Sequence, residues 1–157
     1  MSVIVSDSNG NPAPNTVVTL NVWPVEFRIG YWVMNVDNEW VVAESAWYPN
    51  EDENKNLLND DDEDLASNSN PKSGDDELTP AISSAGTVPG TIKTDENGVA
   101  TFDLIYLKEY SRFIRTEITA TALVYGSETT AKTDFVLSYM AGDEANLSSS
   151  PFNDDTK

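Results

Sequence analysis

Apolar and polar residues alternate along several short segments of this chain, and this alternation constrains the fold more than any other sequence feature. Residues 16–22 place Val18, Leu20 and Val22 on one side, as a strand with one buried face requires. The same period of two recurs at residues 99–106, 116–125 and 129–138. Turn-forming residues separate the segments about every ten positions, so we predict an all-β fold of seven to eight antiparallel strands.

An acidic stretch interrupts this alternation in the middle of the chain. Residues 50–64 contain eight Asp or Glu among fifteen positions and a single Lys. We therefore predict one domain over residues 1–139 that carries a long acidic loop insertion at residues 50–80. Residues 140–157 are rich in Ser, Asp and Asn, so we expect them to form a flexible tail or linker.

Charge and missing residue types exclude several classes of function. The chain has nine Lys and Arg against 27 Asp and Glu, whereas nucleic acids and anionic membranes attract clustered basic residues. It has no Cys and no His, so disulfides, thiolate metal sites and a His general base are excluded. No apolar run approaches the roughly 20 residues of a membrane span, so we expect no membrane insertion.

Two turn motifs, each flanked by strand-like segments, follow one another along the chain. Residues 3–22 read VIVSDSNGNPAPNTVVTLNV and contain a D-x-x-G-N-P-x-P turn. Residues 91–137 contain TDENGVA, a T-D-x-x-G-x-A turn, followed by two closing strands. Together these stretches resemble the bacterial immunoglobulin-like domain of the intimin/invasin type (group 1). The resemblance covers roughly two-fifths of the chain.

This resemblance implies an immunoglobulin-like β-sandwich, used in tandem arrays that hold an adhesive tip away from the bacterial surface. It also implies neighbouring immunoglobulin-like domains as partners and an extracellular, cell-surface or periplasmic location. The middle of the chain departs from the family pattern at WPVEFRIGYW and at the acidic insertion. That region resembles a variant carried by large bacterial surface or secreted proteins.

Within the acidic insertion, oxygen-bearing residues recur at the spacing of a calcium-binding loop. Such loops take ligands from positions 1, 3, 5, 7 (through the carbonyl), 9 and 12. Counted from the first aspartate, these positions are Asp52, Asn54, Asn56, Leu58, Asp60 and Glu63. Because calcium is a hard cation that prefers oxygen ligands, we predict that this loop binds a structural calcium ion.

Some features of the loop leave alternatives open. Leu57 occupies position six, where a glycine usually provides a positive φ, and the flanking helices of an EF-hand are missing. The ligand set could be shifted or shared, because further carboxylates lie in the same run at Asp61, Asp62 and Asp64. A second, less regular set is Asn68, Asn70, Asp75 and Asp76. The simpler interpretation is a solvated acidic loop that binds no specific ion.

Aromatic residues gather between Trp23 and Tyr48, around a hairpin turn predicted at residues 37–38. We predict that Trp32 and Trp40 lie in the core, and that Trp47 and Tyr48 pack over the base of the acidic loop. If these rings were exposed, they would instead suggest stacking on a carbohydrate.

Three functions are compatible with these features. The first is a structural or adhesion module, a spacer stabilised by calcium. The second is a module that binds a surface glycan or protein through the aromatic region and the acidic loop, and the third is calcium-dependent self-association. We predict no enzymatic activity, because the carboxylates lie mostly in a polar run where no burial would raise the pKa of a general acid.

Overall fold

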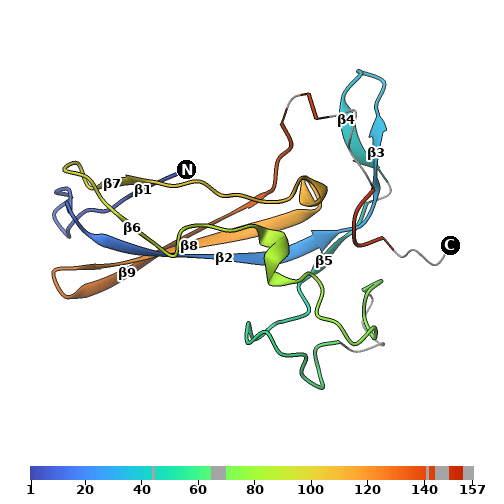
Figure 1. Cartoon of the computed structure of the whole chain (residues 1–157), viewed down its shortest axis with the longest axis horizontal. Coiled ribbons are helices and arrows are strands. Elements are labelled where there is room, and N and C mark those ends of the chain that lie inside the picture. Colours follow the sequence, from blue (N-terminus) through green and yellow to red (C-terminus); the bar gives the residue numbers. More distant parts are fainter. Residues whose placement is uncertain (44, 65–69, 141, 144–148, 154–157) are drawn as a thin grey trace. The chain divides into compact units, whose positions relative to one another are not determined.

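A computed structural model of the chain describes residues 1–43, 45–64, 70–140, 142–143 and 149–153. The described residues form nine β-strands and two short 3-10 helices (Figure 1). The strands are β1 (Ser2–Ile4), β2 (Val17–Arg28), β3 (Tyr31–Met34), β4 (Trp40–Ala43), β5 (Trp47–Pro49), β6 (Thr91–Lys93), β7 (Val99–Thr101), β8 (Ile114–Val124) and β9 (Ser127–Val136). The helices are η1 (Ile82–Ala85) and η2 (Lys108–Tyr110).

The strands pair into one larger sheet and two small ones. The larger sheet has the order β5-β2-β8-β9, with β6 also paired to β2. β1 pairs with β7, and β3 pairs with β4 in the hairpin predicted around residues 37–38. The all-β fold is therefore confirmed. In the described part of the chain, no helix is both long and apolar enough to cross a membrane.

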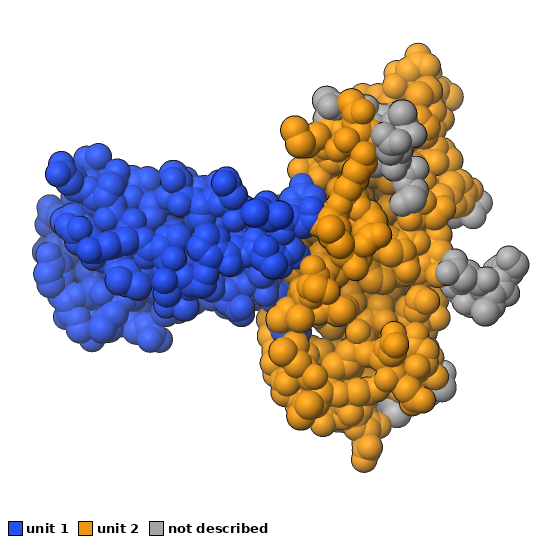
Figure 2. Space-filling model, in the orientation of Figure 1, with its two compact units in different colours: residues 1–23, 86–106, 117–134 blue, residues 24–85, 107–116, 135–157 orange. Residues whose placement is uncertain are grey.

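The chain divides into two compact units, coloured separately in Figure 2. Unit 1 comprises residues 1–23, 86–106 and 117–134, and unit 2 comprises residues 24–85, 107–116 and 135–157. The sequence placed all residues up to 139 in one domain with an insertion. The structure includes the acidic segment in unit 2, together with the aromatic-rich strands β3, β4 and β5, and the extent of the domain stays a prediction.

Unit 1 is built on the predicted alternation. In β2, Val18 and Leu20 are buried whereas Val17 is 55% exposed. β6 lies antiparallel to this part of β2, with Val18 opposite Ile92. One face of each strand therefore supplies the core, which includes Val5, Ala13, Val18, Leu20, Trp23, Ala100, Phe102, Ile118 and Ala122.

The two turn motifs found in the sequence are hydrogen-bonded to each other in unit 1. The Val5 amide donates to the carbonyl of Gly98 at 2.8 Å. The buried Thr94 hydroxyl donates to the carbonyl of Ala13 at 2.7 Å and accepts from the amide of Thr16 at 2.9 Å. A Cβ atom at Gly98, where φ is +71°, would clash with the carbonyl oxygen of Val5. This close approach explains why the second turn contains a glycine.

Unit 2 has an aromatic core. Phe27, Phe113, Ile114 and Leu137 are essentially inaccessible to solvent. β5 pairs with the second half of β2, so that Phe27 lies opposite Tyr48. This pairing places the start of the acidic segment directly beside the core of the unit.

Part of the segment predicted as a flexible tail packs against unit 2. The Ser150 hydroxyl donates to the carbonyl of Arg28 at 2.6 Å, and the Gly30 amide donates to Oδ1 of Asn153 at 2.8 Å. Phe152 is 8% exposed, with its ring centroid 5.0 Å from that of Phe27. Residues 150–153 are therefore anchored, because the Phe152 ring packs on Phe27 and polar groups bond to the backbone at the end of β2 and just after it.

Candidate metal centre

The acidic segment (green in Figure 1) begins at a buried asparagine. Asn50 is 7% exposed, and its Nδ2 donates to the carbonyl of Pro24 at 2.6 Å. Its backbone amide donates to the carbonyl of Val25 at 3.0 Å, and its Oδ1 accepts from the amide of Asp52 at 2.9 Å. The first predicted ligand is thus fixed relative to β2.

The first half of the predicted calcium loop curls around Asp52, which is only 4% exposed. Its Oδ1 accepts from the amide of Asn56 at 3.0 Å and its Oδ2 from that of Leu57 at 2.9 Å. Oδ1 of Asn54 accepts from the amide of Asn56 at 2.9 Å, and Oδ1 of Asn56 from that of Leu58 at 2.7 Å. Each side-chain oxygen therefore holds the chain two to five residues farther on, which curls the loop.

The second half of the loop closes back on the first. Nδ2 of Asn54 and Nδ2 of Asn56 both donate to Oδ2 of Asp60, each at 2.8 Å. Glu63 is 6% exposed, and its two carboxylate oxygens accept from the amides of Asn54 at 3.3 Å and Asp60 at 3.4 Å. Five predicted ligand side chains therefore share one network. Leu58, predicted to bind through its carbonyl, has a side chain that is 62% exposed.

The backbone at position six of the loop has a positive φ, although the residue there is a leucine and not the usual glycine. Leu57 has φ +65° and Lys55 has φ +62°. This left-handed conformation costs roughly 1–2 kcal/mol for a residue with a Cβ atom. The leucine is therefore strained at the position where calcium loops have glycine. The hydrogen bond from its backbone amide to Oδ2 of Asp52 helps to hold this conformation.

The donor set fits calcium better than a transition metal. Among the described residues, no group of three or more Asp, Glu, His or Cys side chains is gathered closely enough to hold a metal ion. The predicted set has three carboxylates, and its other oxygens come from Asn side chains and a backbone carbonyl, which calcium accepts. A calcium ion would have to draw Asp52, Asp60 and Glu63 closer together. It would also replace the two amide N–H groups that now face Asp60.

A third buried carboxylate, Glu51, was missed by the sequence analysis. Glu51 is 5% exposed. Its Oε1 accepts from Nδ2 of Asn70 at 2.8 Å and from the Ser73 hydroxyl at 3.2 Å, and its Oε2 accepts from the amide of Thr79 at 2.8 Å. Glu51 therefore ties the two ends of the acidic segment together. No local spacing marks it, because its partners lie 19 to 28 residues away.

The environment of Glu51 disfavours its charged form. Burial raises the pKa of its carboxyl above the ordinary value of 4.5, while hydrogen bonds from Thr79 and Ser73 oppose this change. The negative charges of Asp64 and Asp75 raise the pKa further. Desolvation and the two negative charges thus outweigh the hydrogen bonds that Glu51 accepts.

The residues of the second ligand set suggested by the sequence hydrogen-bond to different carboxylates. Asn68 lies outside the described residues. Asn70 donates to Glu51, whereas the amide of Asp76 donates to Oδ2 of Asp64 at 2.7 Å. Oδ1 of Asp64 also accepts a hydrogen bond from the amide of Gly74. Asp64 therefore organises a turn of its own.

A cleft of about 290 Å³ lies between the end of β5 and the acidic segment. Glu63 from the loop network and Glu51 both line it. Its other lining residues are Tyr48, Pro49, Asn50, Glu53 and Asn70. Three of the seven lining residues are carboxylates, so the cleft favours cations over anions.

The aromatic residues only partly follow the prediction. Trp32 and Trp40, expected in the core, are half-buried, whereas Trp23 is buried at 6% exposure. Tyr48 lies at the base of the acidic segment and lines the cleft. Trp47 lies under two guanidinium groups instead, with its ring centroid 4.8 Å from Arg28 Cζ and 5.5 Å from Arg115 Cζ.

Searches of family models, curated proteins and solved structures found no match to this chain. The resemblance to the intimin/invasin-type domain therefore stays a prediction from two sequence motifs.

Proposed function

We propose that this chain is a non-enzymatic structural module whose acidic segment is held in shape by a calcium ion. The ligands would be Asp52, Asn54, Asn56, the carbonyl of Leu58, Asp60 and Glu63. The observation that carries the proposal is the burial of Asp52 and Glu63 at opposite ends of one side-chain network. The sequence spacing suggested the six ligands, and the hydrogen-bond network that joins five of their side chains supports the proposal.

Electrostatics favours a cation at this position. Residues 50–64 carry eight acidic side chains against one Lys, and buried carboxylates repel one another more strongly than exposed ones. The amide N–H groups of Asn54 and Asn56 supply only partial positive charge to Asp60. A divalent cation supplies a full counter-charge and offsets the strain at Leu57.

We further propose that the module is an immunoglobulin-like β-sandwich serving as a spacer in a bacterial surface or secreted protein. Support comes from the two turn motifs, which are far apart in the sequence and hydrogen-bonded in unit 1. A calcium clip fits an extracellular location, because extracellular calcium modules bind with dissociation constants of about 10⁻⁴–10⁻³ M. Under this proposal the neighbouring domains of the same protein are its partners.

The hydrogen bonds of Glu51 support a non-enzymatic role, and the contacts of Trp47 bear on the glycan-binding alternative. Both oxygens of Glu51, the buried carboxylate with a raised pKa, accept hydrogen bonds from the protein itself. This arrangement is that of a structural tie rather than of an acid poised toward a substrate. The ring of Trp47 contacts Arg28 and Arg115, which disfavours the glycan-binding alternative at that residue.

The test is thermal unfolding of the chelator-treated chain during titration with calcium, and with magnesium in parallel. At a calcium concentration of about a hundred times Kd, binding to the folded state adds about 2.7 kcal/mol. The midpoint should then rise by roughly 5–10 °C, and magnesium should give a much smaller rise.

A matched pair of variants locates the ion. Asp52→Ala should abolish the calcium-induced shift, whereas Asp61→Ala should keep it, because Asp61 is exposed and outside the predicted ligand set. Both variants remove one negative charge from the same run. No calcium shift in the parent chain, or equal loss in both variants, would contradict the proposed site.

A further inference from the structure

The outer edge of β9 is an unpaired strand edge in unit 1. β9 is the last strand in the order β5-β2-β8-β9, and no described strand pairs with its other side. Every residue from 127 to 134 is exposed. Such an edge presents backbone N–H and C=O groups to any strand that can lie beside it.

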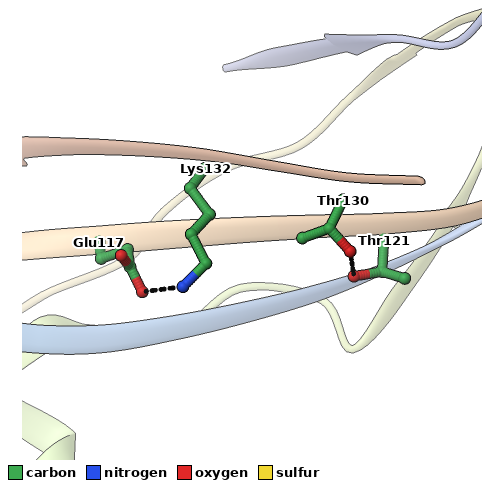
Figure 3. Close-up of polar contacts among 4 residues, drawn as sticks. All are labelled: Glu117, Thr121, Thr130 and Lys132. Carbon is green, nitrogen blue, oxygen red and sulfur yellow. Dashed lines mark hydrogen bonds and ion pairs between the residues drawn. The ribbon is translucent and has the colours of Figure 1, made fainter.

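The composition of this edge favours strand pairing. Residues 127–134 read SETTAKTD, with three β-branched threonines and neither Pro nor Gly. On β8, its neighbour, Glu117 accepts from Nζ of Lys132 at 3.2 Å, and the hydroxyls of Thr121 and Thr130 lie 3.1 Å apart (Figure 3). These cross-strand contacts hold Thr130 and Lys132 in an ordered row at the edge.

We propose that two copies of this chain pair through β9, antiparallel, around a two-fold axis at Thr130. In this register Lys132 lies opposite the partner's Glu128, and Glu128 lies opposite the partner's Lys132. A lysine in an edge strand usually prevents pairing. Here Lys132 of each copy faces an acidic residue of the other copy, because a symmetric interface repeats each contact.

Charge favours this register over axes at Glu128, Ala131 and Lys132, and an axis at Thr129 would form no charge pair. An axis at Glu128 or at Lys132 would place that residue opposite its own copy, with like charges in contact. An axis at Ala131 would place Glu128 opposite the partner's Asp134. Like charges directly opposite each other destabilise a strand pair, whereas opposite charges stabilise it.

An axis at Thr133 would also pair opposite charges, Lys132 with the partner's Asp134. The Glu128→Lys variant separates the two registers, because Glu128 faces a lysine only when the axis lies at Thr130.

Two properties of the dimer follow from this arrangement. The net charge of −18 makes the two copies repel each other at long range, so moderate salt should strengthen pairing by screening that repulsion. β9 contributes residues 127–134 to unit 1, while the predicted calcium ligands lie in unit 2. Pairing is therefore expected both with calcium and with chelator.

The experiment is sedimentation of the full chain, with two charge reversals studied alone and mixed. The parent chain should dimerise with rising concentration. Glu128→Lys would place lysines opposite lysines, and Lys132→Glu would place glutamates opposite glutamates. For each variant alone, the dissociation constant of the dimer should rise at least about tenfold, because both charge pairs become repulsive.

An equimolar mixture of the two variants should form a heterodimer, since each lysine of one chain then faces a glutamate of the other. This rescue requires both variants to be folded and does not arise from a loss of stability. A parent chain that stays monomeric up to about 1 mM would overturn the proposal. So would unchanged dimers in both variants, a mixture that stays monomeric, or a dimer that disappears with chelator.

Discussion

The turns of unit 1 and the acidic segment of unit 2 use the same local device in different surroundings. Oδ1 of Asp95 accepts from the amides of Asn97 at 2.8 Å and Val99 at 2.9 Å, as Asp52 does from residues farther along its own loop. Asp95 is exposed, whereas Asp52 is 4% exposed. Water can solvate the first carboxylate, whereas the second is buried and depends on hydrogen bonds within the protein.

The pKa values show the same contrast. The Val99 and Asn97 amides lower the pKa of Asp95, and a hydrogen bond from the Asn11 side chain is the main cause that lowers that of Asp7. In unit 2, burial raises the pKa of Glu51 despite its three hydrogen bonds. Hydrogen bonds therefore outweigh desolvation at the exposed turns, whereas desolvation outweighs them at the buried Glu51.

The largest effect is expected from removing the apolar base of the acidic segment. Phe27→Ala should lower the free energy of unfolding by about 3–5 kcal/mol, because Phe27 is fully buried between Tyr48 and Phe152. Val17→Ala, on the same strand and 55% exposed, is the control and should have little effect. Urea unfolding measures both. Similar losses would contradict the packing of Phe27 between Tyr48 and Phe152.

A smaller effect is expected from the turn of unit 1. Gly98→Ala should cost roughly 2–4 kcal/mol, combining a left-handed φ with a clash against the Val5 carbonyl. Gly126→Ala is the matched control, because φ there is +83° and nothing lies within 4 Å of the added Cβ. It should cost only about 1 kcal/mol. Equal losses in chemical unfolding would mean that the two turn motifs are not closely packed.

The smallest effect concerns the pH dependence of unfolding of the calcium-free chain. The folded-state pKa of Glu51 is raised above 4.5, so its contribution to stability is complete below pH 4.5 and decreases as pH rises through the folded pKa. Glu51→Gln should therefore gain stability relative to the parent as pH increases through that window. A chemical unfolding series over pH measures this difference.

The exposed neighbour Glu53 provides the control, since Glu53→Gln changes the net charge equally. If Glu51→Gln gave the same pH profile as this control, the buried carboxylate would not differ electrostatically from the accessible ones. At the other extreme, Asp7 and Asp95 have lowered pKa values, so their contributions should be lost as pH falls below the ordinary value of 3.8.

Sequence determined the parts of this protein that depend on local chemistry. The two-residue period predicted the buried side of the first part of β2, at Val18 and Leu20, because successive side chains of a strand point to opposite faces. It did not predict the rest of the strand, where Val22 is half-buried and Trp23 is buried. The spacing from Asp52 to Glu63 predicted calcium ligands, which stays a prediction. Five of these side chains share a hydrogen-bond network, because side-chain oxygens of Asp and Asn bond to backbone amides only a few residues away.

Tertiary structure decided the features that join distant residues. The tie from Glu51 to Asn70 and Thr79, the docking of Phe152 on Phe27, and the contact of Trp47 with two arginines all depend on the path of the chain. The positive φ of Leu57 is another such case. Local preference opposes that conformation, and hydrogen bonds from the surrounding loop outweigh the preference once the loop has closed.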